Sequence, residues 1–163
     1  MLKTKTKSLK PKTKSLKTKT ITKSLKNKYI DNNLFSNFQK EITILFLEIL
    51  LMIKLFHWKT TSYAIHKATD EAYSKLNTNI DSFIEVLLGK TGKRTDLMNH
   101  KNIQLIDLNS VDSFKFKIYE FKKYLINLNF NKAMLQMSNT DLYNIRDTIL
   151  GDMNQLLYLL SLN

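Results

Sequence analysis

Apolar residues recur at steps of three and four through most of residues 34–161, and very little interrupts them. The chain has 163 residues but only three glycines and one proline. Because these two residues mark most turns, their scarcity favours long helices over a many-stranded sheet. Hydrophobic residues make up 43% of the sequence, which is enough for the core of one domain of ordinary size. We therefore expect an all-α fold.

Four segments carry this repeat and predict helices at residues 34–59, 62–88, 112–129 and 139–161. Thr60 or Thr61 is the expected N-cap of the second helix, and Gly89 and Gly92 supply its C-terminal turn. Asn109 or Ser110 precedes the third helix, and the fourth begins near Ser138 with Asp141 as a capping acid.

The connections between these segments differ greatly in length. A few residues join the first two helices, whereas residues 93–111 form a long connection with room for one short helix. A short first turn and a long crossover predict a ferritin-like four-helix bundle rather than a simple up-down-up-down arrangement.

The first helix is apolar almost all round between Ile42 and Phe56. A transmembrane span is the obvious rival, but Glu48 and Lys54 interrupt the run, which is shorter than the usual ~20 residues. We expect instead that this helix is buried on two sides, by its own bundle and by another subunit. A membrane partner is therefore not expected.

The N-terminal segment carries nearly all of the excess charge. Of the 26 Lys and Arg residues, eleven lie in residues 1–28, which contain no acid, and the remainder has 15 basic against 14 acidic residues. The pentapeptide TKSLK occurs three times, at 6–10, 13–17 and 22–26, at spacings that maintain no helical face. Too few apolar residues are present to offset the entropy of ordering, so we expect a disordered tail at 1–30 and a folded domain at 31–163.

A flexible polycation of this kind neutralises phosphates and releases counterions, so we expect the tail to bind DNA without sequence preference. RNA and anionic membrane are alternatives, but the tail lacks the bulky apolar face of an interfacial helix. It also lacks the continuous apolar stretch of a secretory signal, so secretion is not expected. The candidate nucleic-acid-binding residues are Lys3, Lys5, Lys7, Lys10, Lys12, Lys14, Lys17, Lys19, Lys23, Lys26 and Lys28.

Histidines and carboxylates on the first two helices form a candidate metal site. The chain has no cysteine, so any metal must be held by imidazole and carboxylate, a ligand set suited to iron or zinc. His66 and Asp70 are four residues apart on one helical face, and so are Asp81 and Glu85. About 22 Å of helix separates the two pairs, so one metal cannot contact both within a chain.

An antiparallel pairing of helix 62–88 with its copy near residues 75–76 would bring the two pairs together. Each dimer would then hold two sites, and His57 at the end of the first helix could close each of them. The alternative is that each of these five residues is an ordinary polar residue, solvent-facing or hydrogen-bonded.

The motif FHW…H…D followed by IDSFIE resembles the Dps mini-ferritins, the starvation-protection relatives of ferritin. The matching residues, in order, are His57, Trp58, His66, Asp70, Asp81 and Glu85. The resemblance implies an iron site shared between two-fold-related subunits, and it covers residues 34–88. The stretch from His57 to His66 is about three residues shorter than in that family and lacks its glycine-containing turn. The lysine-rich tail, which lies outside this match, resembles the extensions with which some Dps proteins hold DNA.

Three longer stretches resemble an uncharacterised ferritin-like family of tailed phages and large DNA viruses, over residues 34–162. They are FHWKTTSYAIHKATDEAY, IDSFIEVLLGKTGK and NIRDTILGDMNQLLYLL. This resemblance implies a viral protein in the virion or the infected cell, either cytoplasm or nucleus, but no established activity.

Three functions remain open at this point, one of which is a membrane-associated capsid component that uses the first helix and the basic tail. The other two are the following. The first is a Dps-like, ferroxidase-type protein that oxidises iron(II) with peroxide or oxygen and binds DNA through its tail. The second is a non-enzymatic structural virion or genome-packaging protein that uses the bundle only to form homo-oligomers. A classical di-iron site within one chain is not expected, because it needs Glu-x-x-His on two helices and the last helix has no histidine. His100, in the long connection, is expected to be a surface residue.

Overall fold

A computed structural model describes residues 32–162, so the lysine-rich tail and its candidate DNA-binding residues lie outside the described part. This stretch contains helices and no strand. The four long helices are α1 (Asn32–Lys59), α2 (Tyr63–Thr91), α3 (Val111–Asn127) and α5 (Thr140–Leu159). Two short ones, the 3₁₀-helix η1 (Leu128–Phe130) and α4 (Lys132–Gln136), separate α3 from α5.

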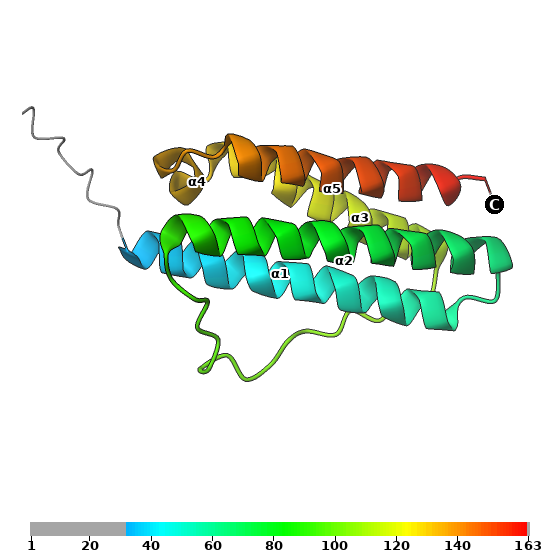
Figure 1. The fold of residues 1–163 in the computed structure, drawn as a ribbon. Helices are drawn as coiled ribbons and strands as arrows, with labels where there is room; N and C mark the ends of the chain where they lie inside the picture. The colour runs from blue at the N-terminus through cyan, green and yellow to red at the C-terminus, as the bar shows by residue number, and fades with distance from the viewer. Residues whose placement is uncertain (1–31, 163) are drawn as a thin grey trace, which may run out of the picture.

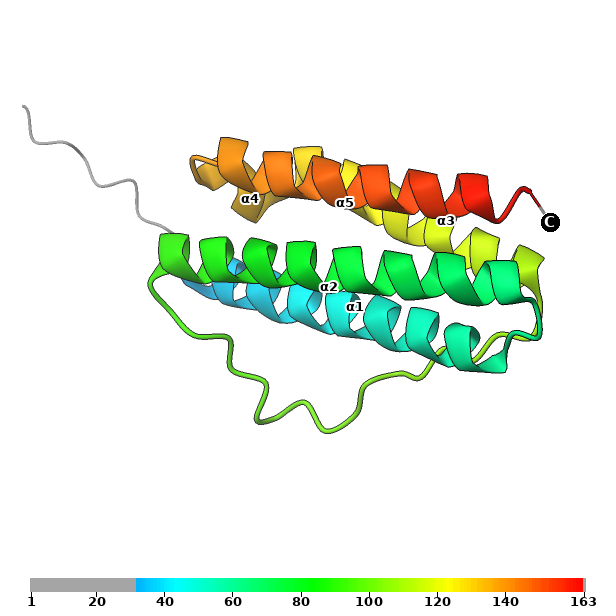
Figure 2. The ribbon, with the colours of Figure 1, turned by 45° about the vertical axis from the view of Figure 1, so that its right-hand side comes forward.

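The four long helices lie side by side (Figures 1 and 2). A tight turn makes α1 and α2 antiparallel neighbours, and α5 packs along α2. The connection that follows α2 returns to the opposite end of the body, so α3 runs in the same direction as α2 (Figure 1). The chain then turns through η1 and α4, and α5 runs back toward the end where α1 and α2 are joined.

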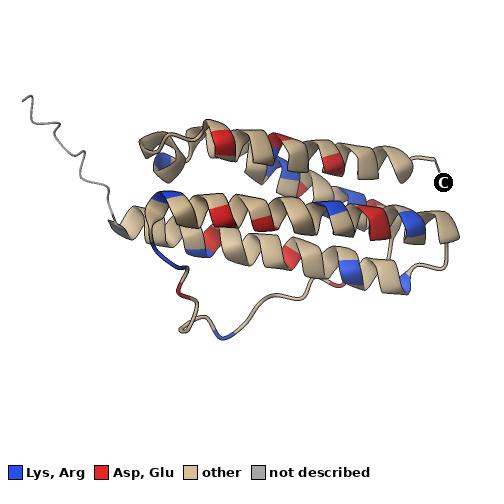
Figure 3. Ribbon diagram, viewed as in Figure 1, with Lys and Arg blue, Asp and Glu red and all other residues tan. Residues whose placement is uncertain are grey.

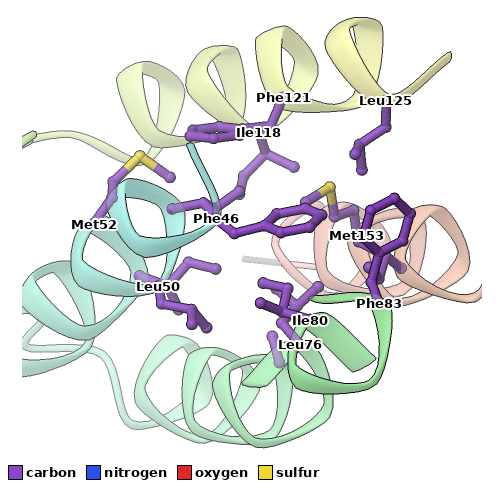
Figure 4. Packing of buried hydrophobic residues seen from close by; sticks show 14 of the residues in the cluster. Phe46, Leu50, Met52, Leu76, Ile80, Phe83, Ile118, Phe121, Leu125 and Met153 are labelled. Carbon is purple, nitrogen blue, oxygen red and sulfur yellow. The ribbon is translucent and has the colours of Figure 1, made fainter. Parts of the chain in front are cut away.

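All four long helices contribute to one hydrophobic core (Figure 4). The ring of Phe46 on α1 meets that of Phe83 on α2 edge to face, with the ring centroids 5.4 Å apart. Phe56 and Phe114 stack at 4.1 Å and join α1 to α3. Burial of these large apolar side chains is the main source of stability in a body with no disulfide.

Several helix ends follow the expected capping chemistry, but others do not. Gly92 ends α2 in the left-handed conformation (φ 64°), and the Ser110 hydroxyl accepts a hydrogen bond from the Ser113 amide at the start of α3. The N-cap of α2 is Ser62 rather than Thr60 or Thr61, because its hydroxyl accepts from the Ile65 amide. Asn139 occupies the N-cap position of α5.

The connection between α2 and α3 contains no helix in its described residues 93–110. The short helical segments occur instead after α3, at η1 and α4. The Lys59 ammonium at the end of α1 holds the end of the connection, by donating to Asp107 at 2.7 Å and to Asn109 at 2.6 Å. Ile106 and Leu108 pack against the core, so the connection is fixed to the body at this point.

The side of α1 that faces away from the core remains apolar. Leu47 and Leu51 are 37% and 38% exposed, and Trp58 is 67% exposed. No helix in the described part of the chain is long and apolar enough to cross a membrane. Burial of this side of α1 by another subunit, expected from its sequence, stays a prediction.

Candidate metal centre

The turn between α1 and α2 places the two candidate histidines next to each other. The Thr60 amide donates to the Phe56 carbonyl and closes α1, and the Ser62 amide donates to the Thr60 hydroxyl. Only residues 60–62 separate the helices. Because the turn is so short, the last turn of α1 faces the first turn of α2, and His57 meets His66.

The two histidines bind each other's backbone. The Nδ1 of His57 lies 3.0 Å from the carbonyl oxygen of His66, and the Nδ1 of His66 lies 3.2 Å from the carbonyl oxygen of His57. Since a carbonyl oxygen only accepts, both Nδ1 atoms carry the proton. The rings stack with centroids 3.9 Å apart and an angle of 24° between their planes. In the neutral state, the lone pair of each ring therefore lies on Nε2.

Thr69 fixes the His57 ring from the core side. It is fully buried, and its hydroxyl donates to the Ile65 carbonyl at 2.8 Å. The hydroxyl oxygen also lies 3.2 Å from His57 Nδ1 and can share its proton. The sequence analysis missed Thr69. Its only signal is a polar residue one turn after His66, within the apolar stripe of α2.

Asp70 approaches the free nitrogen of His57. Its Oδ1 lies 3.9 Å from His57 Nε2, which is too far for a direct hydrogen bond. The His57 side chain is 8% exposed and that of Asp70 is 54% exposed, so the pair lies at the edge of the body. Metal–ligand bonds of about 2.0–2.2 Å allow one ion to bridge two ligand atoms at this separation. The donor set of imidazole and carboxylate therefore fits iron or zinc.

Asp81 and Glu85 lie farther along α2, exposed to solvent. By helical periodicity, Asp81 shares the side of α2 that carries Asp70 and faces α1. Within residues 32–162, no group of three or more His, Asp and Glu side chains could hold a metal ion. The chain by itself brings together His57, His66 and Asp70 but not Asp81 and Glu85. His100 is exposed in the connection, as expected.

Charges on the body are mixed in sign and distributed over all four long helices (Figure 3). On the side where α1 and α2 meet, the Lys54 ammonium lies 4.7 Å from the ring centroid of Tyr73 and 5.9 Å from that of Trp58. Tyr63, at the start of α2, is 77% exposed close to the histidines. The region around the candidate centre is thus rich in exposed aromatic rings.

The model of a protein family of unknown function, DUF5856, matches residues 57–160. The chain belongs to this family. The matched region begins at His57 and contains His66, Asp70, Asp81 and Glu85, together with α2, α3 and α5. No curated protein and no solved structure matches the chain. Membership in the DUF5856 family therefore assigns no activity.

Proposed function

We propose that this chain is a ferritin-like, Dps-like protein whose dimers bind iron at sites shared by two copies and whose tail binds DNA. The observation that carries the proposal is the pair of reciprocal hydrogen bonds between His57 and His66. Histidines that ligate metal typically donate the other ring N–H to a carbonyl or carboxylate, which fixes both tautomer and orientation. Here both rings have that arrangement before any ligand is present.

Asp70 adds a carboxylate to the imidazole half of the site. With its Oδ1 3.9 Å from His57 Nε2, the two groups could bind one cation from opposite sides. Structural and catalytic sites of this kind need three or four protein ligands. The ligands that are missing from one chain would come from a second copy, whose Asp81 and Glu85 supply two carboxylates.

The outward face of α1 supports such a dimer. Leu47, Leu51 and Trp58 leave an apolar strip next to the candidate ligands, and large exposed apolar patches mark interaction sites. An isologous contact across this face would bury both copies of the strip together. With the two-fold axis perpendicular to the helices, helix α2 would also lie antiparallel to its copy, which is the arrangement that the shared site requires.

Iron(II) is the expected substrate, with peroxide or oxygen as the oxidant. The eleven lysines of residues 1–28 would hold DNA close to the protein. Placing iron oxidation beside bound DNA would keep iron and peroxide from reacting freely near the nucleic acid. The ferritin-like bundle and the viral setting both rest on the resemblances described above.

A mixed-dimer experiment tests the shared site. Asp81→Asn and His66→Ala damage opposite halves, so each homogeneous mutant protein should lose metal at both sites of its dimer. Co-expression with two different tags isolates dimers that hold one chain of each kind. In these dimers one site carries both lesions and the other is intact, so about half of the metal binding should return. Metal is measured on protein purified without chelator.

His100→Ala is the matched control, because it removes an exposed histidine of the connection between α2 and α3. It should leave metal content unchanged. A site built within one chain would show no recovery in the mixed dimer, since each chain would carry its own lesion. If both homogeneous mutants hold as much iron or zinc as the wild type, the metal site is wrong. The non-enzymatic structural function would then be favoured.

A further inference from the structure

A cavity lies at the end of the body opposite the histidines. The start of α1, the end of α2 and the link from α4 to α5 meet there (Figures 1 and 2). The cavity has a volume of about 370 Å³, within the range of small-molecule sites. Phe35 and Met137 form apolar walls, and Gln39, Thr91, Lys93 and Ser138 contribute polar groups. None of these residues belongs to the proposed metal site.

Gln39 is the unusual residue of this cavity, because it is a polar side chain that is only 3% exposed. Its Nε2 lies 2.5 Å from the Thr91 hydroxyl oxygen. The Thr91 hydroxyl donates its own proton to the Leu87 carbonyl at 2.9 Å, so it must accept from Gln39. This fixes the orientation of the amide, and the Gln39 carbonyl oxygen accepts no hydrogen bond from a described residue.

This oxygen is not among the buried side-chain atoms of the described residues that lack a partner, so it stays accessible to solvent and can accept a further hydrogen bond. The Gln39 carbonyl oxygen belongs to a side chain that lines the cavity, so a ligand with an O–H or N–H group would satisfy it. The apolar walls formed by Phe35 and Met137 favour a hydrocarbon or aromatic body for that ligand.

The cavity also carries one unbalanced positive charge. The Lys90 ammonium is already occupied, since it donates to the Ser138 carbonyl at 2.6 Å and pairs with Asp141 at 2.8 Å. Lys93 lines the same cavity, is exposed and pairs with no carboxylate of a described residue. A ligand with one anionic group would balance this charge.

We infer that this cavity binds a small amphiphilic carboxylate that also carries one hydrogen-bond donor. Its apolar part lies against Phe35 and Met137, its O–H or N–H group donates to Gln39, and its carboxylate pairs with Lys93. The site is independent of the metal centre, so its occupation requires neither the dimer nor iron.

Calorimetric titration of the full chain with 3-hydroxydecanoate and decanoate tests the inference, because these two acids differ by one hydroxyl group. The hydroxy acid should bind more tightly by about two- to tenfold, the usual range for one hydrogen bond. Gln39→Leu should abolish this difference. Lys93→Gln should weaken both acids by about two- to fivefold, as for an exposed ion pair. Lys101→Gln, which removes an exposed lysine of the connection, is the matched control and should change neither.

Ser138→Trp keeps the inference testable if the buried Gln39→Leu change unfolds the protein. Ser138 is exposed, and a tryptophan there should fill the mouth of the cavity and remove binding of both acids. Unchanged binding in Ser138→Trp would place the carboxylates elsewhere, with the lysine-rich tail as the obvious site, and would overturn the inference. So would a full chain that binds neither acid.

Discussion

His57 and His66 face each other as stacked rings, and each ring is held by the backbone carbonyl of the other residue. This relationship joins the last turn of α1 to the first turn of α2. The fold therefore sets the orientation of both imidazoles. If the proposed metal site exists, this preorganisation would reduce the conformational freedom lost on binding and favour tight coordination.

The sequence could predict which residues lie on one helical face, but not this contact. The four-residue spacing places His66 and Asp70 on the same face of α2. His57 lies close to both residues because it is at the end of α1, next to the start of α2. The tautomers depend on which carbonyl oxygens the Nδ1 atoms reach, and this depends on the three-residue turn. A turn one residue longer would rotate α2 and break the reciprocal hydrogen bonds. Spacing within a helix carries no information about that rotation.

The first prediction concerns the dimer. Asn77 is exposed on the side of α2 that carries Asp70 and Asp81, near the expected two-fold axis. Asn77→Arg would place two like charges close together, and we expect the dimer to weaken by about tenfold or more. Sedimentation velocity measures the change. Asn154→Arg, at an exposed position on α5, is the matched control. Identical sedimentation of wild type and both variants would show that the side of α2 that carries Asn77 is not part of the dimer contact.

A second prediction concerns the tail. Removal of residues 1–28 takes away eleven lysines and should abolish the shift of duplex DNA at moderate salt, while circular dichroism still reports a helical body. The full chain should show a slope of log K against log salt of about −0.9 for each phosphate it neutralises. Binding that persists in the truncated protein with the same slope would locate the nucleic-acid surface on the body.

The third prediction concerns the pH dependence of stability. Lys90 at the end of α2 donates a hydrogen bond to Asp141 at the start of α5, and this lowers the pKa of the Asp141 carboxyl below its ordinary value. A lowered pKa in the folded state stabilises the protein above the unfolded value of about 4. This stability is lost as the pH falls through the lowered pKa.

Lys90→Met should therefore reduce the free energy of unfolding at neutral pH, and the difference from wild type should shrink in acid to the contribution of the hydrogen bond to the Ser138 carbonyl. Because Asp141 is largely exposed, solvent screening keeps the loss below about 1 kcal/mol. Urea unfolding across the pH range measures it. Lys101→Met should show no such pH-dependent difference. In an Asp141→Asn background, a Lys90→Met effect of unchanged size would assign the stabilisation to the hydrogen bond to Ser138 and to packing of the lysine stem.

Asp141 also shows where local sequence rules fail. Its place near the start of a helix suggested a capping acid, and its carboxylate does accept from the Leu142 amide. Its ion-pair partner, however, is Lys90, which comes from a different helix. The apolar repeat predicted all four long helices, because packing one face of each into a core decides where helices form. It could not predict η1 and α4, which reflect how the chain reverses between α3 and α5.

The last prediction concerns the core. Phe83 is fully buried on α2 and meets Phe46 of α1 edge to face at 5.4 Å (Figure 4). Phe83→Ala removes the ring and leaves a cavity between α1 and α2, so the free energy of unfolding should fall by about 3–5 kcal/mol. Phe116→Ala on α3 is the same substitution at a side chain that is 61% exposed, and its effect should stay within about 0.5 kcal/mol. Chemical denaturation of both variants measures the two values. Equal losses would mean that Phe116 is buried in solution, against a second copy or another partner, or that Phe83 does not lie in the core.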